Sequence, residues 1–140
     1  MATLTATAAQ STTPAKYTIN GAITRVVDYA LTGNPSLSTG DVIQMLRVPT
    51  GAVVLDVWFI ADQLSGGNYT VTVGDGLDAD RYIATLSTGS TSSWTKMSIA
   101  NAVGYSYSAE DTIDITVGTA TTATQSGVIR LAVTYFMDNT

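Results

Sequence analysis

The 140-residue sequence contains neither cysteine nor histidine. Without cysteine, the fold cannot be held together by disulfides or by thiolate metal sites. The two missing side chains are also those that most readily act as nucleophile or general base near neutral pH, so Ser-His-Asp and Cys-His sites are excluded. A hydrolase would have to use paired carboxylates. The lone glutamate, Glu110, lies beside Asp111 in the chain, and we expect no enzymatic activity.

Charged residues are scarce as well, at 12% of the chain, and acidic residues outnumber basic ones by eleven to six. The net charge of −5 produces a field that repels phosphate backbones and anionic lipids, so we expect neither nucleic acid nor a membrane as partner. No apolar run approaches the roughly 20 residues of a membrane-spanning helix. Residues 1–10 lack the basic and apolar regions of a secretory signal, which predicts synthesis in a cytoplasm without export by the general route.

Threonine and serine make up about a quarter of the chain, and β-branched threonine favours strands. Apolar runs of strand length alternate with clusters of Gly, Pro, Asn, Asp and Ser, as in ordinary β-sandwiches. The eight predicted strands comprise residues 23–29, 41–48, 52–64, 68–73, 81–86, 94–99, 112–117 and 128–136. Eight strands suffice for a jelly roll, so the sequence predicts an all-β, antiparallel jelly-roll sandwich.

Residues 1–20 are predicted to form an extended N-terminal arm, followed by a single domain over residues 21–140. Pro14 bars a helix through this stretch, which is rich in threonine and alanine. Its composition also fits a disordered tail. Apolar residues at strand-like spacing, among them Leu4 and Tyr17, favour an arm that becomes ordered on a partner, and both residues are interface candidates.

The most apolar strand, residues 52–64, has one dry face formed by Val53, Leu55, Val57, Phe59 and Ala61. Its other face carries Trp58 and Ile60 between two aspartates, which is too apolar for a surface that only meets solvent. We therefore predict that something covers this face, and Trp58 and Ile60 are interface candidates. Trp94 lies in a polar run and is predicted at a loop or edge, where it either anchors a partner or folds back over the core.

The string VGDGLDADRYI at residues 73–83 allows two interpretations. In the first, Asp75, Asp78 and Asp80 converge on Ca²⁺, which prefers carboxylate and carbonyl oxygens, although their spacing does not match an EF-hand. We favour a tight turn, in which Gly74 and Gly76 supply positive φ and Arg81 neutralises an aspartate. No other metal site and no cofactor site is predicted, because phosphate-binding glycine motifs are absent.

Three segments together resemble a known family. They are DVIQMLRVPTGAVVLDVWFIAD (residues 41–62), YTVTVGDGLDADRYI (69–83) and GYSYSAEDTIDITVGTATTATQSGVIRLAVTYF (104–136). The strand order and the GDG-x-DADR turn are similar to those of the cement or decoration proteins of tailed-bacteriophage capsids. The likeness is greatest to the jelly-roll cement protein of short-tailed, Bordetella-type phages, and it includes no catalytic signature.

The resemblance implies a virion protein that self-associates and clamps neighbouring major capsid protein subunits on the outside of the shell. It would be synthesised in the host cytoplasm. Isologous association is the commonest closed symmetry, so we expect a homodimer first and a trimer second. The alternative function is a carbohydrate- or receptor-binding module of a virion, suggested by Trp94, Tyr105 and Tyr107 amid a surface rich in serine and threonine.

Overall fold

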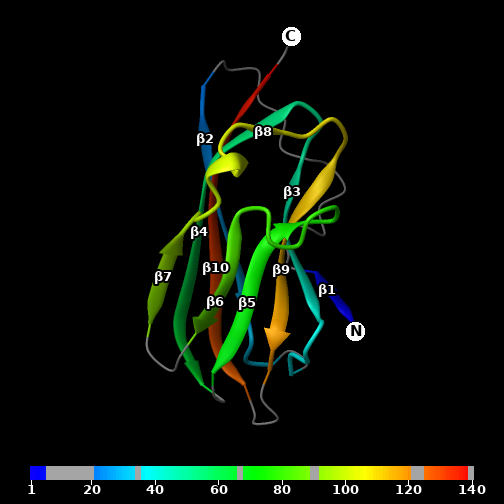
Figure 1. Ribbon diagram of the computed structural model, residues 1–140. Helices are drawn as coiled ribbons and strands as arrows, with labels where there is room; N and C mark the ends of the chain where they lie inside the picture. The colour runs from blue at the N-terminus through cyan, green and yellow to red at the C-terminus, as the bar shows by residue number, and fades with distance from the viewer. Residues whose placement is uncertain (6–20, 34–35, 66–67, 89–91, 121–124, 139–140) are drawn as a thin grey trace.

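The computed structural model describes residues 1–5, 21–33, 36–65, 68–88, 92–120 and 125–138. The elements of this part of the chain are strands and one short 3-10 helix (Figure 1). They are β1 (Thr3–Thr5), β2 (Ile23–Ala30), β3 (Val42–Val48), β4 (Ala52–Ser65), β5 (Tyr69–Asp75), β6 (Ile83–Thr88), β7 (Ser93–Lys96), η1 (Ala100–Ala102), β8 (Tyr105–Ser106), β9 (Asp111–Thr119) and β10 (Ser126–Met137). In the part of the chain that the structure describes, no helix is long and apolar enough to cross a membrane.

The strands form two packed sheets. Sheet A has the order β1-β3-β9-β5-β6, and sheet B has the order β2-β10-β4-β7, with β8 paired to β4. Figure 1 shows the strands of sheet A in front of those of sheet B. Along the chain, β2, β3, β4 and β5 alternate between the sheets, β5 and β6 form a hairpin, and β7, β9 and β10 alternate again. This is the connectivity of an eight-stranded jelly roll, so the predicted fold is confirmed.

The N-terminal strand β1 adds to this framework in an orientation that the sequence did not suggest. It pairs with β3 in parallel, with Leu4 opposite Ile43, whereas the eight strands of the jelly roll pair antiparallel. The backbone nitrogen of Ala2 also donates a hydrogen bond to Asp41 Oδ1 at 2.9 Å. The first five residues of the predicted arm therefore extend sheet A of their own chain, while residues 6–20 lie outside the described part.

The core lies between the sheets and is built by the alternation of apolar and polar residues along each strand. The inward-facing side chains of the last strand are buried, and those of β5 and β9 face them from sheet A. These core residues include Val71, Val73, Ile113, Ile115, Val117, Ile129, Leu131, Val133 and Tyr135. Packing of this kind must stabilise the fold, because the sequence offers no disulfide.

One part of the alternation predicted for β4 is wrong. The inward row is regular only over residues 57–61, and before it Val54 is fully buried while Leu55 is half-buried. The pairing of β4 with β10 shifts register between Asp56 and Val54, which is the signature of a β-bulge. Because an extra residue reverses which side chains face the core, the bulge interrupts the row of odd-numbered residues.

Candidate binding surface

Trp58, Ile60 and Trp94 lie together on the outer face of sheet B, the side directed away from the core. In β4, Trp58 and Ile60 point outward because they alternate with the buried residues 57, 59 and 61. In β7, Trp94 is directly opposite Ile60, and Lys96 is directly opposite Trp58. Strand pairing thus brings together three of the five residues predicted from sequence as interface candidates.

The two indole rings of this surface contact each other, with centroids 5.1 Å apart and planes inclined by 34°. Trp58 Nε1 donates a hydrogen bond to Asp56 Oδ2 at 2.7 Å. Lys96 Nζ lies 3.5 Å from the same oxygen and 5.7 Å from the centroid of the Trp58 ring. Trp94 nevertheless stays 66% exposed. A large aromatic ring is therefore presented to solvent in an orientation that its neighbours fix.

The two remaining interface candidates do not join this surface in the described structure. Leu4 lies in β1 and packs partly buried against the core of its own chain. Tyr17 lies outside the described residues.

The loop between β5 and β6 is organised around Asp75, whose side chain is fully buried. Its carboxylate accepts a hydrogen bond from Arg81 Nε. It also accepts hydrogen bonds from the backbone nitrogens of Leu77 and Asp78, both of length 3.0 Å. The Tyr107 hydroxyl donates to Asp75 Oδ2 at 3.2 Å. The buried carboxylate is therefore saturated by partners from its own chain, as the turn interpretation requires.

Aromatic side chains extend this polar cluster into the core. The hydroxyls of Tyr82 and Tyr107 are 2.7 Å apart, and the Arg81 guanidinium lies 3.8 Å from the centroid of the Tyr105 ring. Burial raises the pKa of both Tyr82 and Tyr107 well above the ordinary value, so both hydroxyls remain protonated donors. The sequence analysis predicted that Arg81 neutralises an aspartate, but it did not identify Asp75 as the partner or include the tyrosines in the cluster.

The glycines of this loop act in a different way from the one predicted. Gly74 and Gly76 are not among the glycines with positive φ, so that expectation is wrong. A Cβ at Gly74 would instead lie 2.0 Å from the carbonyl oxygen of Asp78, because the loop folds back over β5. Thr72 Oγ1 fixes the same segment by donating to the carbonyl of Ala79 at 2.7 Å. Gly74 is needed for close approach of two backbone segments.

The three aspartates proposed for Ca²⁺ do not converge in the structure as described. Asp75 is saturated by the partners above. Asp78 lies 3.8 Å from Arg81 and is partly exposed, and Asp80 is exposed. Across the described ranges, no group of three acidic side chains is placed to hold a metal ion.

A buried acid that the sequence analysis missed is Asp114 in β9. It faces outward from sheet A, opposite Gly74, yet only 6% of it is exposed, and its Oδ1 has no hydrogen-bond partner. Burial and the negative charges of Asp111 and Asp75 raise the pKa of Asp114 to about 7. Asp114 alternates with the buried Ile113 and Ile115, a pattern that predicts a solvent-facing side chain, and no sequence signal showed that the β5–β6 loop folds back beside it.

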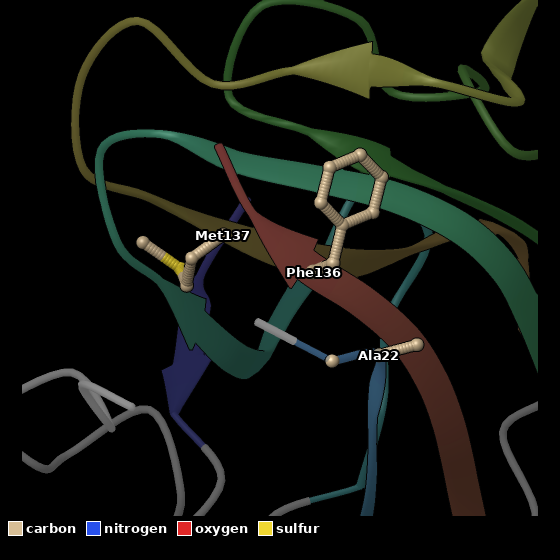
Figure 2. A pocket seen from close by; sticks show the side chains of 4 residues that line it. Ala22, Phe136 and Met137 are labelled. Atoms are coloured by element: carbon tan, nitrogen blue, oxygen red, sulfur yellow. The ribbon is translucent and has the colours of Figure 1, made fainter. Parts of the chain in front are cut away.

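A shallow groove lies where β2 begins and β10 ends (Figure 2). Its volume is about 370 Å³, and it is lined by Gly21, Ala22, Phe136 and Met137. None of these side chains is titratable, so the groove offers apolar contact but no acid, base or nucleophile.

Comparisons with known proteins concern the fold. No protein-family model matches the sequence, and no curated protein is significantly similar to it. A chain of the solved structure "Capsid of Ralstonia phage GP4" superposes with a TM-score of 0.77 at 17% identity, covering 99% of both chains. A chain of "Cyanophage Pam1 capsid asymmetric unit" superposes with a TM-score of 0.63 at 23% identity, covering 93% of this chain and 96% of that one. A chain of the acidic stable capsid of Helicobacter pylori bacteriophage KHP30 superposes with a TM-score of 0.56 at 15% identity, covering 84% of this chain and 92% of that one. The protein therefore shares its jelly-roll fold, over nearly its whole length, with chains of solved bacteriophage capsid structures.

Proposed function

We propose that this protein is a structural component of a bacteriophage virion that binds the outside of the capsid and cements neighbouring major capsid protein subunits. The observation that carries the proposal is the end-to-end correspondence with a chain of a phage capsid, at 99% coverage of both chains. The resemblance of residues 41–136 to phage cement proteins supports the same function.

The physical character of the chain suits adhesion. Two packed sheets form a rigid slab, and the β5–β6 loop is fixed by a buried ion pair and by backbone contacts. The chain as a whole is low in charge, and its surface includes the exposed, fixed Trp94. Many copies of a modest contact, repeated across a lattice, add up to strong attachment by avidity.

Binding to particles tests this proposal directly. Purified protein is mixed with particles of the source phage that have been stripped of it, and the particles are sedimented. We expect saturable co-sedimentation and higher resistance of the refilled particles to heat. Particles that purify without the protein, and that do not bind it when it is added back, would contradict the proposal.

A carbohydrate-binding module is the second candidate, because Trp94 is exposed and fixed as a sugar-stacking ring needs to be. The tyrosines that also suggested it are less suited. Tyr107 is buried in the Asp75 cluster, and Tyr105 lies beneath Arg81. Saturable binding on a glycan array that disappears in Trp94→Ala would favour this candidate over capsid cementing.

A further inference from the structure

One end of sheet A carries most of the net charge of the molecule. β3 ends there and β9 begins there, as the pairing of Val48 with Asp111 shows. β5 ends beside them, with Gly74 opposite Asp114, and the β5–β6 loop continues from that point (Figure 1). We call these segments the acidic end of sheet A. Its six acidic residues are Asp75, Asp78, Asp80, Glu110, Asp111 and Asp114.

Basic residues do not balance the acidic end of sheet A. Two of the six in the sequence, Arg47 and Arg81, lie there beside six of the eleven acidic residues, so its formal net charge is −4. The rest of the chain carries five acidic and four basic residues, a net charge of only −1. Each of the two arginines already forms an ion pair with one acid of this end. The excess of negative charge is therefore not neutralised by neighbouring side chains.

Asp114 shows that the fold leaves this cluster without enough donors. Its side chain faces outward from sheet A, is only 6% exposed, and experiences the negative charges of Asp75 and Asp111. Its Oδ1 has no hydrogen-bond partner. Among the residues that the structure describes, no three acidic side chains are placed to hold a metal ion, so a metal site does not supply the counter-charge. Basic side chains of another molecule, placed over this end, would stabilise it electrostatically.

The β5–β6 loop also presents an apolar side chain to solvent at this end. Leu77 is 84% exposed, more than any other large hydrophobic residue of the described structure except Met1. Carboxylates flank it, since the Asp78 side chain is 44% exposed and Asp80 is exposed. The hydrogen bonds to Asp75 and the close approach to β5 hold the loop in one conformation, which reduces the entropy that association costs. An apolar anchor surrounded by a polar rim is the usual anatomy of a protein interface.

Charge decides which occupant fits the acidic end of sheet A. A net charge of −4 repels nucleic acid, anionic lipid and the same end of a second copy of this chain. It attracts a basic protein surface that belongs to a different chain. We propose that the acidic end of sheet A docks on such a surface, with Leu77 in an apolar pocket and with Lys or Arg side chains of the pocket rim paired with Asp78 and Asp80. This inference rests on the proposed function, under which the basic surface belongs to the major capsid protein.

Co-sedimentation of the purified full-length protein with stripped particles, over a range of protein concentrations, gives the dissociation constant that tests this docking surface. Leu77→Ser removes the apolar anchor, and Asp80→Lys reverses a charge of the rim. Each should raise the dissociation constant about tenfold or more. Added salt should weaken binding of the wild type more than binding of Asp80→Lys, because it screens the attraction that the variant has lost. Both positions are exposed in the single chain, so thermal unfolding should show that the variants remain folded.

Sheet B offers a matched control for each variant. Val26→Ser removes an apolar side chain of β2 that is 59% exposed, and Asp62→Lys reverses the charge of an exposed acid of β4. Asp62→Lys changes the net charge of the chain by the same amount as Asp80→Lys, so a difference between the two isolates the local contact. Both controls should change the dissociation constant by less than about twofold.

The outcomes separate this inference from the proposed function. If the wild type binds the particles and the two loop variants bind equally well, the docking surface is wrong while the proposed function stands. The same holds if the sheet B controls weaken binding as much as the loop variants do. If the wild type does not bind the particles at all, the proposed function fails, and the docking surface fails with it.

Discussion

At the scale of single residues, two aspartates are buried in contrasting environments, although burying a carboxylate is costly in both. Asp75 is surrounded by donors, since Arg81, Tyr107 and two backbone nitrogens all reach it. Asp114 has no cation among the groups that shift its pKa and retains an oxygen without a partner. A buried carboxylate with few donors and no neighbouring cation favours its neutral form. The two residues should therefore respond differently to mutation.

Asp114→Asn should make the protein more stable at alkaline pH. The pKa of Asp114 rises from 3.8 to about 7 on folding, so the folded state keeps a proton that the unfolded chain releases. Its stabilising contribution is complete below the unfolded pKa, declines as pH rises, and is lost above about 7. At about 1.4 kcal/mol per pKa unit, the loss reaches up to about 4 kcal/mol. Urea unfolding across this pH range should show the advantage of the variant growing up to neutrality, while the exposed Asp80→Asn shows none.

Asp75→Asn should destabilise the fold at neutral pH by about 3 kcal/mol, because it leaves the mostly buried Arg81 without its carboxylate partner. Asp78→Asn is the control, since Asp78 is 44% exposed and lies 3.8 Å from Arg81, and it should cost less than about 1 kcal/mol. Chemical unfolding of both variants measures the difference. Equal costs would show that the Asp75–Arg81 pair does not hold the β5–β6 loop.

At the scale of elements, the sequence was sufficient to predict the strands, but not the loop that packs against them or the register between them. Apolar runs between turn clusters, four of them with period-two alternation, predicted all eight strands of the jelly roll, because strand length and burial of alternate residues are local signals. The bulge between Val54 and Asp56 and the loop that packs beside Asp114 depend on pairing between distant segments. The cluster of Trp58, Ile60 and Trp94 was predicted residue by residue, whereas their contact needed the register of β4 with β7.

Gly74→Ala tests whether the β5–β6 loop depends on close backbone approach. The added Cβ would meet the backbone of Asp78 and Ala79 and would force the loop away from β5. We expect a loss of about 1–3 kcal/mol in the free energy of unfolding and faster amide exchange in the loop. Gly76→Ala meets only the movable side chain of Asp111, at 3.2 Å, and should cost less. An equally stable Gly74→Ala variant would refute this account.

At the scale of the whole molecule, the proposed capsid role makes a prediction of its own. A protein that cements neighbouring subunits contacts more than one of them at a fixed spacing, so its second contact forms at high effective concentration. The protein should therefore bind assembled, stripped particles about 100-fold more tightly than it binds the unassembled major capsid protein. Co-sedimentation with particles and titration of the free subunit measure the two dissociation constants. Equal constants would show that each copy contacts a single subunit, and the avidity argument would fail.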